Sequence, residues 1–324
     1  MDHTTSRSLS GYLNFIPRVR YPRPSGSTPG RRPAAPLFDV SEPVAPFKTQ
    51  LLKWIGNKQR FAHEIASYFP DDVGTYFEPF LGSGAVLGTY SPARGVASDA
   101  LKPLAEIWMA LSSDPDELKG WYAERRSQVD ADYSNKIEVY EKVKAAYNNC
   151  PNGADLLYIC RSCYGGVVRF RKHDHYLSTP CGVHKPVPIE SFNKRVDVWV
   201  DRVKGTTFAH LDFREAMQDA RAGDLVYCDP PYTDTQAILY GAQQFVLDDL
   251  FGEIDKCKSR GVRVALSIDG TKKSGLKNIM NAAPEGLFDS EVMVNCGRSM
   301  LRRFQMGGLS LESEVVADRL LLTY

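Results

Sequence analysis

The sequence predicts an α/β fold built on a mostly parallel sheet, with functional groups at the carboxyl ends of its strands. From Phe47 onward, helix-like and strand-like segments alternate, which is typical of such sheets. One apolar run, LVYC, leads directly into DPPYT, whose two prolines cannot continue a strand. Asp229 is therefore expected at a strand's carboxyl end, where open α/β sheets bind their ligands. The alternative is an ordinary turn, because Asp-Pro commonly opens one.

The first part of the chain supplies the expected start of the sheet. A helix is expected from Lys58 to Phe69, where a proline follows and ends it. A strand over 75–77 then leads through a glycine turn into a helix that begins at Ala85. The next strand, 95–98, ends at Asp99.

A long interruption separates these elements from the rest of the sheet. Residues 103–163 have helical apolar spacing, and residues 164–205 are rich in turns and basic groups. Strands are expected to return at 207–211, 225–228, 262–268, 291–295 and 320–323. We therefore divide the chain into a tail, an inserted recognition domain and a catalytic domain in two pieces, with the boundaries 1–46, 112–205, and 47–111 plus 206–324.

The composition favours a cytoplasmic globular protein with a flexible tail. The 324 residues are 43% hydrophobic, and no segment approaches the roughly 18 apolar residues of a membrane span. Residues 1–46 hold eight of the twenty prolines and six arginines, so we expect this tail to be mostly disordered. The tail lacks the apolar core of a signal peptide, and seven scattered cysteines suit a reducing compartment.

Basic residues are concentrated in one region of the chain. Residues 161–205 contain nine Lys or Arg against four Asp or Glu, a local charge of +5 in a chain whose net charge is +1. Such a patch indicates a polyanionic partner, although a solvated surface would have the same composition.

A second informative stretch is TYFEPFLGSGAVLG, residues 75–88. Its strand runs into Gly82-Ser83-Gly84, where the backbone can approach a ligand closely. A dinucleotide site would require glycine where Leu87 stands, and the Gly-Lys-Ser/Thr of a phosphate loop is absent. The acidic Glu78 suits a cationic ligand such as S-adenosylmethionine better than a pyrophosphate. A plain strand–helix turn is the alternative interpretation.

Two further acids stand at strand ends. Asp99 ends the strand that follows the glycines in the sequence, and a carboxylate at this place commonly accepts hydrogen bonds from ribose hydroxyls. Asp212 and Phe213 follow the next strand, and their acid and aromatic face could hold an adenine ring. Either acid could instead be a helix cap.

These motifs together resemble the Dam-type DNA adenine N6-methyltransferases, over residues 51–324. LLKWIGNK (51–58) is similar to the family's opening KWxGGK element, with Asn57 in place of the second glycine. FEPFLGSG and VYCDPPY match its glycine and catalytic motifs. CYGGVVRFRKHDHYLSTPCGVHK (163–185) loosely resembles its DNA-reading hairpin, with Gly165 where the family usually has Asn.

The resemblance implies a Rossmann-like methyltransferase sheet with an inserted, mainly helical DNA-recognition domain that contains a hairpin. It assigns S-adenosylmethionine binding to Lys53, Trp54, Gly56, Lys58, Glu78, Pro79, Phe80, Gly82, Ser83, Gly84, Asp99, Asp212 and Phe213. It assigns the target base to Asp229, Pro230, Pro231 and Tyr232. It assigns DNA contacts to Tyr164, Arg169, Arg171, Lys172 and Lys185.

The implied activity is methyl transfer from S-adenosylmethionine to the N6 amine of an adenine flipped out of double-stranded DNA. The residues leave open an N4-cytosine or RNA adenine methyltransferase, and a DNA-binding protein of the same fold without catalysis. A cognate restriction endonuclease is a further expected partner, and nucleoid association is expected when the protein binds DNA.

A metal site is weighed and not expected. Cys160-x2-Cys163 and Cys181-x2-His184 have a spacing that structural zinc sites use. Cysteines at the end of a buried helix are more often small core residues.

Overall fold

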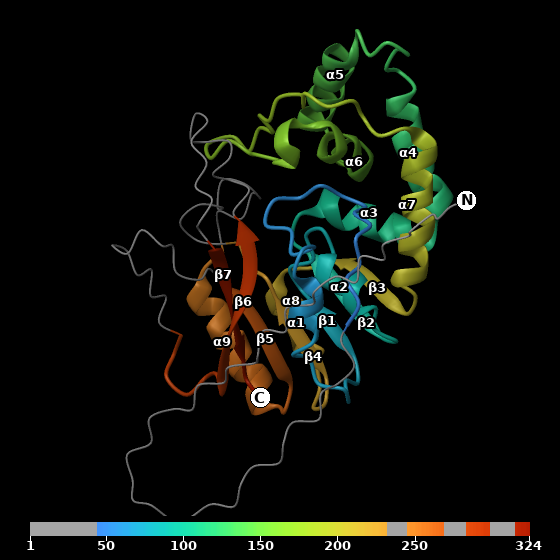
Figure 1. Ribbon diagram of the computed structural model, residues 1–324. Helices are drawn as coiled ribbons and strands as arrows, with labels where there is room; N and C mark the ends of the chain where they lie inside the picture. The colour runs from blue at the N-terminus through green and yellow to red at the C-terminus, as the bar shows by residue number, and fades with distance from the viewer. Residues whose placement is uncertain (1–43, 232–244, 269–282, 299–314) are drawn as a thin grey trace, which may run out of the picture.

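The computed structural model describes residues 44–231, 245–268, 283–298 and 315–324. Within these ranges a seven-stranded sheet has the order β3-β2-β1-β4-β5-β7-β6 (Figure 1). The strands from β3 to β5 in this order are parallel, and β7 is antiparallel to both β5 and β6. The predicted α/β class is confirmed. Most of the expected tail lies outside the described residues.

The strands fall where the sequence predicts them, and β6 and β7 are both longer than expected. Their additional residues pair with each other, as Arg298 does with Val315, and Arg319 of β7 forms an ion pair with Glu291 of β6. The bounds are β1 Tyr76–Glu78, β2 Gly95–Asp99, β3 Thr206–His210, β4 Leu225–Cys228, β5 Arg263–Ile268, β6 Ser290–Arg298 and β7 Val315–Leu322.

Side chains of the central strands alternate between two apolar clusters, one on each face of the sheet. Tyr76 and Tyr227 belong to the cluster built with α1, α2 and α3. Phe77 and Val226 belong to the cluster built with α8 and α9. These helices are α1 Ala62–Ala66, α2 Ala85–Tyr90, α3 Lys102–Ser113, α8 Phe213–Gln218 and α9 Leu247–Ser259.

The register brings the acids predicted at strand ends to one edge. β1 and β4 are neighbours although they are far apart in the sequence, with Tyr76 opposite Leu225. Glu78 is the last residue of β1, and Asp229 directly follows β4. In a parallel sheet this point, where the strand order reverses, opens a crevice at the carboxyl edge.

Four helices of the insert lie beyond the carboxyl edge and along the side of the sheet (Figure 1). They are α4 Pro115–Arg126, α5 Lys136–Asn149, α6 Gly153–Ser162 and α7 Ile189–Arg202. Helix α7 was not predicted within 164–205, the stretch expected to be rich in turns and basic groups. It forms because Phe192, Val196 and Trp199 recur at helical spacing and bury one face.

Helix α1 is shorter than the predicted helix from Lys58 to Phe69. Residues before Ala62 form turns, in which Phe61 N–H donates to the Lys58 carbonyl and Gln59 N–H donates to the Asn57 side chain. These turns direct the Lys58 side chain into the protein, where it is nearly fully buried.

The expected hairpin is an open one. Isolated antiparallel bridges join Cys163 to Cys181 and Phe170 to Leu177, and no continuous ladder connects these two bridges. Asn148 of α5 fixes the second arm of the hairpin, because its side chain accepts a hydrogen bond from the Leu177 N–H and donates one to the Leu177 carbonyl. No helix within the described ranges has the length and apolar character needed to cross a membrane.

Candidate active site

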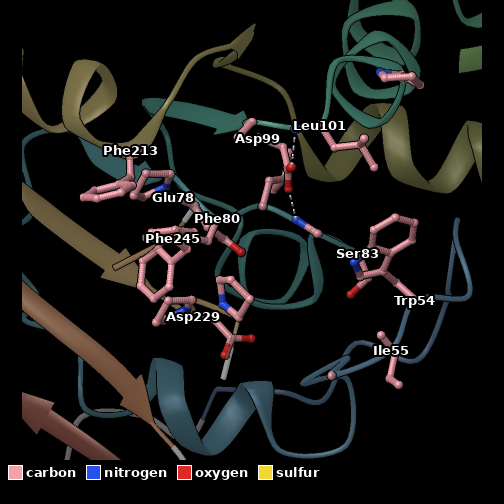
Figure 2. A pocket seen from close by; sticks show the side chains of 18 of the residues that line it. Trp54, Ile55, Glu78, Phe80, Ser83, Asp99, Leu101, Phe213, Asp229 and Phe245 are labelled. Atoms are coloured by element: carbon pink, nitrogen blue, oxygen red, sulfur yellow. Dashed lines mark hydrogen bonds between the residues drawn. The ribbon is translucent and has the colours of Figure 1, made fainter. Parts of the chain in front are cut away.

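A cavity of about 740 Å³ opens at the carboxyl edge of the sheet. Its walls come from the 54–58 turns, the ends of β1, β2 and β4, and the loop after β3. The insert contributes residues of α5 and the hairpin, including Tyr147 and Tyr176. The size suits a ligand of cofactor dimensions together with a second group. Figure 2 shows acids, aromatic rings and the glycine turn around this space.

Glu78 lies at the bottom of the cavity and is almost completely buried. Burial raises the pKa of its carboxyl to about 8, and the nearby negative charge of Asp229 adds to the rise. The Tyr76 hydroxyl donates to Glu78 over 2.6 Å, which works in the opposite direction and lowers the pKa. Glu78 is therefore largely protonated at neutral pH, so it can lose a proton when a cation binds beside it.

The glycine turn requires glycine at two positions, and at the second of them a steric contact is an additional reason. Gly82 and Gly84 both have positive φ, at 50° and 64°. A Cβ on Gly84 would lie 2.7 Å from the ring of Trp108, whose indole N–H donates to the Gly82 carbonyl. The turn is thus held against α3, and its Gly82 side faces the cavity.

Asp99 joins the glycine turn to the next helix. Its carboxylate accepts hydrogen bonds from the Gly82 N–H at 3.0 Å and the Leu101 N–H at 2.9 Å, as drawn in Figure 2. Burial raises the pKa of Asp99, while these two backbone donors lower it. The hydrogen bonds fix the carboxylate at the cavity wall.

Three phenylalanines form one side of the cavity (Figure 2). Phe80 and Phe213 are stacked with ring centroids 5.3 Å apart, and Phe245 meets both rings edge-on at 5.8 Å. Phe245 was not predicted, because it belongs to no motif and its segment offers no strand or turn signal. The cluster offers flat apolar surface suited to an aromatic ring.

Asp212 serves as the cap of α8. Its side chain accepts from the Arg214 backbone N–H, and the Glu215 carboxylate accepts from the Asp212 N–H in return. Arg214 also pairs with Asp212 at 2.9 Å and lies over the Phe213 ring at 4.4 Å. The capping alternative therefore holds for Asp212, which lines the cavity as well.

Asp229 is paired with a buried lysine. The Lys58 ammonium lies 2.9 Å from an Asp229 oxygen and 3.3 Å from an oxygen of Asp318, which comes from β7. The exposed fractions of the three side chains are 5% for Lys58, 20% for Asp229 and 11% for Asp318. Asp318 was not predicted, because nothing in the sequence relates it to the first turns of the fold.

Most predicted cofactor-site residues line this one cavity, the exceptions being Lys53 and Gly84. Lys53 instead packs against Gly166 at the base of the hairpin. Burial and the neighbouring Arg161 lower the pKa of Lys53. Asp229, Pro230 and Pro231 line the cavity, and Tyr232 lies outside the described residues.

The predicted DNA-contacting residues lie on the hairpin, and none of these five side chains lines the cavity. Tyr164, Arg169 and Lys172 are exposed. Arg171 pairs with Asp174 at 2.9 Å and stacks on Tyr176 at 4.1 Å, while Lys185 lies over the ring of Tyr133. Within the described ranges, no group of three His, Cys, Asp or Glu side chains is arranged to hold a metal ion.

Comparison with known proteins gives a consistent result. The sequence model of the family described as D12 class N6 adenine-specific DNA methyltransferase matches residues 54–285. The chain is 26% identical over 239 residues to the type II methyltransferase M1.LlaDCHI of Lactococcus lactis subsp. cremoris, covering 66% of this chain and 79% of that protein. It is 25% identical over 228 residues to a DNA adenine methylase of Haemophilus influenzae, covering 66% and 78%. It is 26% identical over 207 residues to the retron Ec67 DNA adenine methylase of Escherichia coli, covering 62% and 69%.

Proposed function

Because this chain belongs to the family of D12 class N6 adenine-specific DNA methyltransferases, we propose that S-adenosylmethionine is its methyl donor and that the target adenine leaves the duplex to enter the cavity. Methylation of adenine in DNA is the activity of the family, and the relatives from Haemophilus influenzae and Escherichia coli are named DNA adenine methylases. The observation that carries the finer proposal is the shared cavity of Glu78, Asp99, the phenylalanines and Asp229.

The residues present fit this donor. S-adenosylmethionine, when bound, supplies a methyl group carried on a positively charged sulfur. Asp99 is suited to accept hydrogen bonds from hydroxyl groups of a ribose. The Phe80, Phe213 and Phe245 cluster is suited to an aromatic base. Glu78 can become anionic beside a cation, and the Gly82 turn lets backbone approach the ligand closely.

Asp229 and the carbonyl of Pro230 are the groups we assign to the target amine. The adenine amine is a weak nucleophile because its lone pair is delocalised into the ring. Hydrogen bonds donated by the amine to these two acceptors would localise that lone pair. The same carboxylate stabilises the positive charge that develops on nitrogen as the new bond forms. Asp229 is also in place to receive the proton that the methylated nitrogen then releases.

The insert is proposed to recognise the duplex. Its hairpin presents Tyr164, Arg169 and Lys172 to solvent, and other hairpin residues such as Tyr176 line the cavity. Base extrusion costs a few kcal/mol, which contacts in the cavity must offset. On this proposal residues 112–205 form the recognition domain, and the enzyme acts on double-stranded DNA in the cytoplasm, where it is nucleoid-associated when bound.

The first prediction tests Asp229. Asp229→Ala is expected to lower methyl transfer by a factor of about a hundred or more, since it removes a preorganised acceptor at the reacting nitrogen. The measurement is incorporation from tritiated S-adenosylmethionine into unmethylated duplex DNA, with cofactor binding followed by calorimetry. Cofactor binding should persist. Asp289→Ala, which removes an exposed carboxylate paired with Lys258, serves as the control. Wild-type activity in Asp229→Ala would overturn the assignment.

A cognate restriction endonuclease is the partner suggested by one relative's name, a type II methyltransferase. If such an enzyme accompanies this one, DNA methylated by this protein should resist its cleavage while unmethylated DNA is cut. Sequencing of methylated DNA would also identify the recognition site.

A further inference from the structure

Asp318 reaches the active-site edge because β7 runs against the direction of its neighbours. Residues of β5 and β7 pair as Ser267 with Leu320 and Ile268 with Arg319. Asp318 therefore lies one position past the last residue of β5, on the same edge of the sheet as Asp229. Its place in the strand falls outside 54–285, the stretch matched by the family model.

The Asp318 side chain also lies on the same face of the sheet as Asp229. Leu320 and Leu322 belong to the apolar cluster that contains Tyr227, whereas Leu321 belongs to the opposite cluster. Because strand side chains alternate with a period of two, Asp318 shares a face with Leu320, and Asp229 shares one with Tyr227. The contacts of Lys58 with both carboxylates agree with this placement.

We propose that Asp318 is a positioning residue for methyl transfer, acting through Lys58. This inference rests on the proposed role of Asp229 as acceptor for the target amine. Lys58 contacts one Asp229 oxygen, and the target amine needs an oxygen of the same carboxylate, so the two donors share Asp229 when the base enters. Asp318 gives the ammonium a second anionic partner, which holds it in place while Asp229 is shared.

The charge of Asp318 matters as well as its hydrogen bond. Lys58, Asp229 and Asp318 together carry one net negative charge, on the side of the cavity where positive charge moves from donor to amine. Without the Asp318 charge the three groups would be neutral, and Lys58 would lose its 3.3 Å contact with the second carboxylate. Both effects make the reacting amine harder to bind and its developing charge harder to stabilise.

The test compares charge removal with charge retention at one position. Asp318→Asn is expected to lower the single-turnover rate of methyl transfer about tenfold, with Kd for S-adenosylmethionine unchanged within a factor of two. Asp318→Glu keeps the charge and should restore the rate to within about threefold of wild type. Glu291→Gln, which neutralises an exposed carboxylate on the neighbouring strand, should match wild type. The DNA is an amplified, unmethylated fragment containing the mapped site.

A double-mutant comparison then shows whether Asp318 acts through Lys58. In a Lys58→Met background, Asp318→Asn should cause much less than a tenfold loss, because the group it positions is gone and only the direct effect of its charge remains. A second tenfold loss there would overturn the proposal, as would equal rates for the Asn and Glu variants. An active Asp229→Ala would instead defeat the proposed function itself. If Asp229→Ala is inactive and Asp318→Asn is fully active, the proposed function survives and the inference about Asp318 fails.

Discussion

Among single residues, Glu78 shows how burial changes acid chemistry at this sheet edge. Its pKa of about 8 follows from desolvation and the neighbouring charge of Asp229. The unfolded chain ionises this carboxyl near the ordinary value of 4.5, whereas the folded chain keeps the proton until about pH 8. The folded state thus binds more protons between these two pH values. The contribution of Glu78 to stability is highest below pH 4.5 and declines as pH rises toward 8.

Glu78→Gln should make the pH dependence of stability flatter. Between pH 5 and pH 8 the wild-type protein is expected to lose about 2–4 kcal/mol more of its unfolding free energy than the variant does. The measurement is denaturant unfolding at several pH values in that range. Parallel curves for the two proteins would show that Glu78 ionises near its ordinary pKa.

Residue-level prediction succeeded where a strand end determined the position. Glu78, Asp99 and Asp229 could be placed together because parallel strands share one carboxyl edge. Lys58 and Asp318 could not be related in this way, since their contact depends on β7 inserting between β5 and β6. The DNA-binding and base-binding roles of the predicted residues stay predictions until they are tested.

At the scale of elements, helices α2 and α7 show how packing overrides local propensity. Gly88 lies inside α2, where alanine would ordinarily favour the helix. A Cβ at this position would meet the buried ring of Trp199 from α7 at 2.5 Å. The Arg202 side chain of α7 also donates to the Gly88 carbonyl at 2.7 Å, so the two helices are joined by both packing and hydrogen bonding.

Gly88→Ala should therefore destabilise the protein, by about 1–3 kcal/mol, because the extra methyl overpacks this contact. Gly120→Ala in α4 is the matched control, since a Cβ there has no atom within 4 Å. That control should be stabilising by up to about 1 kcal/mol. Thermal and denaturant unfolding of both variants measures the difference, and a stabilising Gly88→Ala would contradict the packing argument.

The errors in predicted elements have local causes. The α1 helix starts late because turns before it direct Lys58 inward, a requirement that helical spacing cannot reveal. Helix α7 was missed because its charged residues resemble a basic loop. Its apolar residues Phe192, Val196 and Trp199 were the signal that could have identified it.

For the molecule as a whole, part of the positive charge of the basic region, residues 161–205, is used in contacts within the protein. Arg161, Arg195 and Arg202 donate to backbone carbonyls of the protein itself. Lys194 and Lys204 pair with acids on their own helix or its end. The local charge of +5 predicts a polyanionic partner, and the family acts on DNA, but composition could not show how many cations are used internally.

Arg169 and Lys172 are both exposed on the hairpin, and substitutions at the two positions test two different kinds of DNA contact. If Arg169 contacts a base edge, Arg169→Ala should cost about 1–3 kcal/mol on the target site and reduce discrimination between sequences. Lys172→Ala should weaken binding similarly on all sequences and reduce the salt dependence by about one charge. Binding titrations at several salt concentrations, on target and unrelated duplexes, measure both effects. A uniform loss for Arg169→Ala would indicate a phosphate contact.

The strand order has a consequence for synthesis of the enzyme on the ribosome. Within the described part of the chain, β6 pairs with β7 alone, so it has no neighbour when it first emerges. The two strands must join the sheet together once β7 has been translated. A nascent polypeptide that lacks β7 leaves β5 as an edge strand with one side unpaired. Translation products that end before β7 should therefore lack methyltransferase activity, because their sheet is incomplete and they have no Asp318.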